Sequence, residues 1–220
     1  GRKMRLYQEF LQHDTLDDYW KRIQLTPADF ARIDIPVMVT TGWFDGDQTG
    51  AFYYWRGMQA RPGGADQYLT VGPWTHIQSY LGGAEKMGEL TLPKDSIVDN
   101  KAMHLAFYDR YLKQSSAALD RPRVRVFVTG TNEWKASDVY PLPATPTRLY
   151  LASGGKANTL NGDGALSWSV QARGAADAYA FDPHNPIALN LMGELFATDR
   201  TKVQERPDVL VYSTAPLAKK

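Results

Sequence analysis

Two short apolar runs of strand type, separated by a helix-length segment, constrain the fold of this chain most. Residues 35–42 are mostly apolar and β-branched, and residues 67–71 form a second such run. Runs of this kind suit strands that are buried on both faces of a parallel sheet. Residues 51–60 read as a helix, which a Pro-Gly-Gly stretch ends. The order strand, helix, strand predicts an α/β fold. Ligands bind such sheets at the loops after the strands, here residues 43–50 and 72–76.

Helices are predicted on both sides of this unit. Residues 5–25 carry apolar side chains near helical spacing, with a break at Asp14 and Thr15, either of which can cap a second helix. Residues 26–29 start another short turn or helix. Residues 100–113 read as a strong amphipathic helix. Its expected apolar face comprises Met103, Leu105, Phe107, Tyr111 and Leu112.

The second half of the chain has a different pattern. A mainly polar linker at residues 115–122 precedes residues 123–128, whose alternation predicts a half-buried strand. Further short strands are expected at residues 147–152, 166–170, 178–181 and 208–213. Turn-forming residues separate them, so this region is predicted to be all-β, most simply a sandwich. A jelly roll has about eight strands, and fewer are visible here.

Composition removes several classes of partner and cofactor. Lys plus Arg number 25 and Asp plus Glu 24, which gives no electrostatic reason to expect nucleic acid or an anionic membrane. The chain has no cysteine, so disulfides and cysteine–metal sites are excluded. No apolar run is long enough for a transmembrane helix. The first residues lack the apolar core of a signal peptide, and the sequence does not choose between cytoplasm and export. No cofactor is predicted.

Asp45 and His76 are the candidate catalytic residues. Each follows one of the two predicted strands, and Asp45 precedes His76 in the chain. A Ser-His-Asp triad needs a carboxylate on the far nitrogen of the imidazole, and α/β-hydrolases carry the acid before the histidine. Taken singly, the aspartate could be a turn or cap residue and the histidine a solvated loop residue. Their occurrence on consecutive strand-end loops favours the catalytic interpretation.

Two motifs support that interpretation through a family resemblance. Gly42-Trp43-Phe44-Asp45 and the run from Gly72 through Pro73, Trp74 and Thr75 to His76 resemble the cocaine esterase / X-Pro dipeptidyl-peptidase family of serine hydrolases. The stretch Arg206-Pro207-Asp208-Val209-Leu210 is similar to one in that family's C-terminal domain. The resemblance implies that Asp45 is the triad acid and His76 the base.

The resemblance also implies a division of the chain. Residues 1–32 would be the end of a helical cap, and residues 33–116 the C-terminal part of an α/β-hydrolase domain. Residues 117–220 would be a partial, jelly-roll-like β-sandwich. The implied activity is hydrolysis of a small-molecule ester, amide or dipeptide-like substrate through an acyl-enzyme. The compartment, the substrate and a homo-oligomeric state remain open.

The chain departs from this family at the nucleophile. No Gly-x-Ser-x-Gly elbow occurs, so the nucleophile is unknown, and the oxyanion hole is expected to be absent as well. Loss of a triad nucleophile costs about 10⁶-fold in turnover, so this polypeptide alone is predicted to be inactive. The missing N-terminal half of the same enzyme is its expected partner.

Further residues receive secondary roles. By the same resemblance, Asp47 could bind a substrate ammonium group, although a helix cap or turn explains it as well. Trp43, Phe44 and Trp74 could wall an acyl pocket, and core packing explains them equally. The other histidines, His13, His104 and His184, are interpreted as structural, and no metal site is predicted because no pair has ligand spacing. Residues 158–163 carry oxygen ligands but favour a β-turn.

Two other interpretations stay open. The β-rich half could be a non-catalytic binding or assembly module, for which an aspartate and a histidine on successive strand-end loops have no use. The chain could also be a degenerate hydrolase that kept its acid and base but lost the serine. The upstream sequence would separate these alternatives directly.

Overall fold

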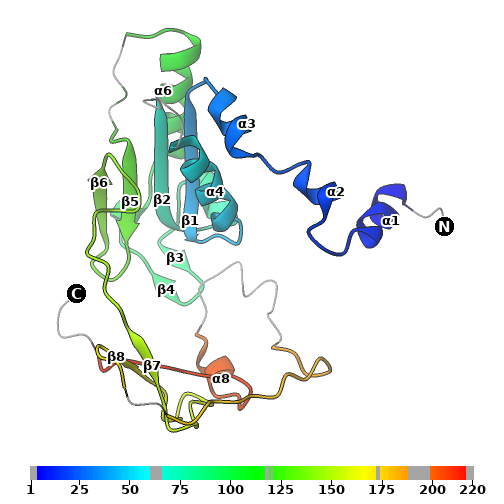
Figure 1. Ribbon diagram of the computed structural model, residues 1–220. Helices are drawn as coiled ribbons and strands as arrows, with labels where there is room; N and C mark the ends of the chain where they lie inside the picture. Colours follow the sequence, from blue (N-terminus) through cyan, green and yellow to red (C-terminus); the bar gives the residue numbers. More distant parts are fainter. Residues whose placement is uncertain are drawn as a thin grey trace.

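A four-stranded mixed sheet is the centre of the computed structural model (Figure 1), which describes residues 4–59, 66–116, 119, 121–171, 174–187 and 199–216. The strands lie in the order β1-β2-β5-β6. Strand β2 is parallel to both β1 and β5, and β6 is antiparallel to β5. Their bounds are β1 Val37–Phe44, β2 Gln67–Thr75, β5 Val124–Val128 and β6 Glu133–Ser137. The α/β class predicted from the two apolar runs is therefore confirmed.

Helices cover both faces of this sheet because successive side chains of β2 point to opposite sides. On one face, helix α4 (Gln48–Gln59) contributes Phe52 and Trp55 to a core that also contains Leu69, Val71, Val124 and Val126. On the other face, helix α6 (Asn100–Leu112) brings Phe107 against Tyr68, with ring centroids 6.2 Å apart. Each burial of a large apolar side chain contributes about 1.5–3 kcal/mol.

Helix α6 confirms the predicted segment, but its buried face is narrower than expected. Phe107 is buried, and the hydroxyl groups of Tyr111 and Tyr68 lie 3.2 Å apart. Leu105 and Leu112 are 51% and 75% exposed, so their assignment to the inner face was wrong. Both lie off the helical stripe that Met103, Phe107 and Tyr111 form at intervals of four residues.

Both parallel strands run further than the sequence predicted, and this shortens the loops after them. Strand β1 ends at Phe44 and β2 at Thr75, so residues 43, 44 and 72–75 are strand and not loop. The register pairs Gly42 with Gly72 and then shifts before Phe44. Both glycines allow the close approach of Trp74, because a Cβ on Gly42 would lie 2.0 Å from its carbonyl oxygen and one on Gly72 2.1 Å from its ring.

A short helix that the sequence did not reveal follows β2 directly. Helix α5 spans His76–Leu81, and Thr75 caps it with a capping box that includes Gln78. Six residues are too few for a recognisable apolar period. His76 is therefore the first residue of a helix instead of a loop residue.

Three short helices precede the sheet. Helix α1 (Arg5–Gln12) and helix α2 (Asp18–Lys21) flank the predicted break, and they project away from the sheet (Figure 1). The residue that caps α2 is Asp17, whose side chain accepts from Tyr19 N at 2.9 Å, and neither Asp14 nor Thr15 has this role. Helix α3 (Pro27–Arg32) starts where predicted, with a capping box between Thr26 and Asp29.

Strand β5 confirms the alternating segment near residue 124, and its pairing was not foreseen. It lies beside β2 and forms a hairpin with β6, so the sheet crosses the domain boundary predicted at residues 116/117. Strand β6 was missed because its sequence, Glu-Trp-Lys-Ala-Ser, is polar and largely exposed. A small hairpin, β3 Lys86–Met87 with β4 Leu90–Thr91, and a 3₁₀ turn at Lys94–Ser96 precede α6.

The C-terminal region contains less regular structure than predicted. Strands β7 (Tyr150–Ala152) and β8 (Ala165–Ser167) form an antiparallel pair; β7 lies within one expected segment, and β8 overlaps another but begins one residue before it. Residues 178–181 are irregular, and residues 208–213 make only isolated bridges, at Leu210 and Ser213. A short helix, α8 (Thr201–Gln204), was not expected. Within the described ranges, no helix combines the length and the apolar character needed to cross a bilayer.

Candidate active site

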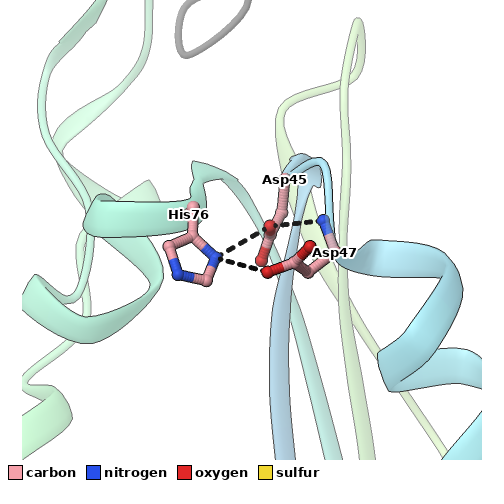
Figure 2. Close-up of side chains that lie close together, drawn as sticks. All are labelled: Asp45, Asp47 and His76. Atoms are coloured by element: carbon pink, nitrogen blue, oxygen red, sulfur yellow. Dashed lines mark hydrogen bonds and ion pairs between the residues drawn. The ribbon is translucent and has the colours of Figure 1, made fainter. Parts of the chain in front are cut away.

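The structure brings Asp45 and His76 into contact at the carboxyl ends of β1 and β2 (Figure 2). Nδ1 of His76 lies 3.1 Å from Oδ1 of Asp45. The Asp45 side chain is 6% exposed and that of His76 40% exposed. Because the strands are parallel and adjacent, the residues that follow them meet at one edge of the sheet. The arrangement joins a buried carboxylate to an imidazole that remains accessible.

Several donors fix the Asp45 carboxylate. The Thr41 hydroxyl donates to Oδ2 at 3.3 Å, and the Asp47 N–H donates to Oδ1 at 2.9 Å. The turn itself is closed by Asp45 N donating to Gly42 O at 3.2 Å and by the Gln48 side-chain amide donating to the same oxygen at 2.9 Å. With ring and donors in place, Asp45 has partners on both oxygens and little freedom to rotate.

His76 presents its second nitrogen away from the aspartates. Nδ1 faces the carboxylates, whereas Nε2 has no hydrogen-bond partner among the described residues. The ring of Tyr80, one helical turn further along α5, stands edge-on to the imidazole with centroids 5.3 Å apart. This geometry leaves Nε2 available to exchange a proton with a group outside the described structure.

Asp47 lies closer to the imidazole than the sequence indicated. Its Oδ2 is 3.5 Å from Nδ1 of His76, although the side chain is 83% exposed. Its backbone carbonyl accepts from Ala51 N at 3.1 Å, as at a helix N-cap. Ligand atoms of Asp45, Asp47 and His76 lie within 4.8 Å of one another, a grouping that could hold a cation. The absence of a metal remains a prediction.

Of the two tryptophans proposed as pocket walls, Trp74 is buried in the interior and Trp43 is partly buried against the core. Trp74 has no exposed surface, and its indole N–H donates to Ser96 O at 3.3 Å. Trp43 donates to Phe127 O at 2.6 Å. These contacts favour the packing interpretation for both residues. Phe44 is partly buried at the end of β1.

No serine hydroxyl in the described part of the chain bonds to the His76 ring. Ser79 is the serine nearest in sequence, and its hydroxyl donates to the backbone oxygen of His76 at 2.6 Å. It is 6% exposed inside α5. A serine in this position faces the main chain of the histidine and cannot pass a proton to Nε2.

The remaining candidates have structural contacts. His13 pairs with Asp17 at 2.5 Å, and Nδ1 of His104 donates to the carbonyl oxygen of Asn100 at 2.6 Å. His184 lies in a turn in which its N–H donates to Asp182 at 2.9 Å. The β-turn predicted within residues 158–163 is confirmed by Gly162 N donating to Thr159 O at 3.2 Å.

A cavity of about 660 Å³ lies in the C-terminal β region and not at the Asp45–His76 pair. Its acidic lining residues are Asp163 and Asp177. Asp177 accepts from the Ser153 hydroxyl at 2.6 Å and from Ala157 N at 2.8 Å, and Asp163 accepts from two backbone N–H groups. Each carboxylate joins separate backbone or side-chain donors, which favours a structural role for both residues.

Comparison with known proteins agrees with this geometry. Residues 2–78 match the family model described as X-Pro dipeptidyl-peptidase (S15 family). Residues 116–220 match the X-Pro dipeptidyl-peptidase C-terminal non-catalytic domain. A cocaine esterase from Rhodococcus sp. (strain MB1 Bresler) is 35% identical to this chain. The aligned region covers 95% of this chain and 37% of the esterase. A putative serine esterase of Mycobacterium bovis is 27% identical to this chain. The aligned region covers 62% of this chain and 19% of the esterase.

Solved structures give the same result. An α-amino acid ester hydrolase superposes with a TM-score of 0.78 and 26% identity, covering 98% of this chain and 37% of that one. An aminopeptidase from a marine sediment thaumarchaeon gives a TM-score of 0.73 and 25% identity, covering 97% and 36%. The chain thus spans less than two fifths of these relatives.

The sheet and the residues at its strand ends place the first part of the chain in the α/β-hydrolase class, and a C-terminal β region follows it. Within that class, the chain belongs to the cocaine esterase / X-Pro dipeptidyl-peptidase family of serine hydrolases.

Proposed function

We propose that the complete protein hydrolyses ester or amide bonds through an acyl-enzyme, with His76 as general base and Asp45 as the acid of the triad. The observation that supports this most directly is the 3.1 Å contact between Nδ1 of His76 and a carboxylate that is 6% exposed. A buried acid on the far nitrogen fixes the tautomer and leaves Nε2 as the base.

The steps assigned to this chain are proton transfers at Nε2. In acylation, Nε2 accepts the proton of a serine hydroxyl while the serine oxygen attacks the substrate carbonyl, and it then donates that proton to the leaving group. In deacylation, Nε2 takes a proton from water, which attacks the acyl-enzyme, and returns it to the serine oxygen. Asp45 stays ionised throughout and stabilises the imidazolium.

The serine and the oxyanion hole belong to a portion outside this chain. The chain spans 37% of cocaine esterase, and no described serine bonds to the ring. In the described structure β1 has only β2 as a neighbour, although eight consecutive strand residues with this composition are typical of an internal strand. We place the missing N-terminal half against the open edge of β1.

The substrate is a small-molecule ester, amide or dipeptide-like compound. Asp47 carries an exposed carboxylate next to His76, where it could bind the ammonium group of an α-amino acyl substrate. We assign residues 1–32 to the end of a helical cap and residues 33–116 to the hydrolase part. We assign residues 117–220 to a jelly-roll-like domain whose first two strands, β5 and β6, continue the hydrolase sheet; the β7–β8 pair and the family match give this assignment partial support.

A fluorophosphonate probe tests the proposal. It should label one serine of the complete protein outside residues 1–220 and none within this chain.

In the complete protein, Asp45→Asn should lower kcat by about 10⁴-fold, and His76→Gln by about 10⁶-fold. The matched control is His104→Gln, because His104 also lies in a helix but bonds only to a backbone carbonyl, and its kcat should stay unchanged. A complete protein without any labelled serine would instead be a degenerate hydrolase.

A further inference from the structure

Two carboxylates of different burial face the same ring nitrogen. Nδ1 of His76 lies 3.1 Å from Asp45 Oδ1 and 3.5 Å from Asp47 Oδ2 (Figure 2). The Asp45 side chain is 6% exposed, whereas that of Asp47 is 83% exposed. A triad needs one acid at this nitrogen, so the second carboxylate is not explained by the proposed mechanism.

The main chain holds Asp47 in this position from both sides. Its N–H donates to Asp45 Oδ1 at 2.9 Å, and its carbonyl accepts from Ala51 N at 3.1 Å in the first turn of α4. The turn that supplies Asp45 with a donor therefore also directs the Asp47 side chain to the imidazole. Its high exposure leaves the carboxylate solvated, so it reaches the ring without the cost of burying a second charge.

We propose that Asp47 is a positioning residue that shares with Asp45 the task of holding His76 in its Nδ1–H tautomer. This inference rests on the proposed hydrolase function for its kinetic consequences, while the ring contact itself belongs to this chain. An ionised carboxylate only accepts hydrogen bonds. Two such acceptors at Nδ1 both favour the tautomer that leaves Nε2 unprotonated and able to act as a base.

The difference between the two acids appears when Asp45 is replaced. The amide of an Asp45→Asn variant can donate to Nδ1 and select the wrong tautomer, which explains the large loss of kcat in serine proteases. Asp47 opposes that selection because it can pair only with a protonated Nδ1. The loss caused by Asp45→Asn should therefore be smaller with Asp47 present than without it.

A double-mutant cycle in the complete protein measures this coupling. In the wild-type background we expect Asp47→Asn to lower kcat by about 2- to 5-fold. In the Asp45→Asn background the same substitution should cause a loss at least about ten times larger than that. The loss should occur for des-amino esters as well as for α-amino esters, and Asp47→Glu should restore part of it. The control is Asp95→Asn, which removes the same charge from an exposed position, and its effect should be equal in both backgrounds.

Nitrogen NMR of histidine-labelled protein gives a readout independent of activity. The Nδ1–H signal of His76, assigned by its loss in His76→Gln, should weaken in each single variant and disappear in the double variant. Additive losses of kcat, or a double variant whose spectrum equals that of Asp45→Asn, would overturn the inference. A loss confined to α-amino esters would overturn it in favour of ammonium binding. The hydrolase proposal fails separately, through the absence of a labelled serine.

Discussion

At the scale of single residues, the approach of two strands places the site. Gly42 lies opposite Gly72, immediately before the irregularity that turns β1 toward Asp45. The space above Gly42 is occupied by the backbone of Trp74, whose carbonyl oxygen would lie 2.0 Å from an added Cβ. Backbone atoms in a paired strand cannot move aside as a flexible side chain can, so the contact has to be relieved by separating the strands.

Gly42→Ala is therefore expected to lower the free energy of unfolding by about 3 kcal/mol and to disturb the Asp45–His76 contact. Gly46→Ala is the matched control, because nothing lies within 4 Å of the corresponding Cβ. Its effect should stay within about 0.5 kcal/mol. Urea denaturation of both variants against the parent chain measures the difference, and equal midpoints for the two variants would contradict this account.

Which residues meet at the site could be predicted only in part from the sequence. The order of the two strands, together with the family resemblance, predicted that Asp45 and His76 approach each other, because parallel neighbours end at one edge. The contact of Asp47 with the ring depends on the shift in register after Gly42, which no local pattern reports. The contact between Tyr80 and the His76 ring could have been predicted if the short helix had been, because residues four apart lie on the same face of a helix.

At the scale of elements, side-chain hydrogen bonds replace regular strands in the C-terminal region. Asp177 connects three segments: it accepts from the Ser153 hydroxyl at 2.6 Å, from Ala157 N at 2.8 Å and from the Tyr212 hydroxyl. The hydrogen bond from Ser153, with those from Tyr212 and Ala157, holds the pKa of Asp177 below its ordinary value. Ionised Asp177 therefore stabilises the folded state.

The pH dependence of stability follows from this direction. Because the pKa is lower in the folded chain, the stabilisation is complete above the ordinary aspartate value of 3.8 and is lost as the pH falls below it toward the folded value. Asp177→Asn should lower the melting temperature near pH 6 and flatten its decline below about pH 4. The Arg206–Asp208 pair persists in this variant and retains its own acid dependence. Thermal unfolding from pH 6 to pH 2 measures both effects; an unchanged slope would exclude this role for Asp177.

The elements that the sequence predicted are those with a sustained apolar pattern. Helix α6 and strands β1 and β2 have such a pattern; the errors concerned the ends of the two strands and the width of the buried face of α6. Residues 178–181 alternate like a strand but are irregular, because nearby backbone groups bond to side chains: Ala178 O accepts from the Asn158 amide at 2.9 Å. Long-range partners of this kind leave no periodic signal in the sequence.

At the scale of the whole molecule, one sheet joins the two halves that the sequence separates. The composition changes near residue 115, yet β5 lies beside β2 and continues the sheet. Tertiary pairing between segments about fifty residues apart cannot be read from local composition. Strand β2 pairs on both sides at Leu69–Val71, whereas β1 pairs on one side only in the described structure.

Hydrogen exchange of β1 tests whether its open edge receives the N-terminal portion that we propose for the complete protein. In a parallel pair, alternate N–H groups point to opposite neighbours. Alternate amides of Val37–Phe44 should therefore exchange quickly in this chain alone and become protected in the complete protein, because a new strand accepts from them. The amides of Leu69–Val71 serve as the internal control, since both neighbouring strands are present in the chain and protection should be similar in the two samples. Measurement at two protein concentrations removes the contribution of self-association at the same edge. Uniform protection of β1 in the dilute chain would show that its edge is already covered, and the complementary half would then have to bind elsewhere.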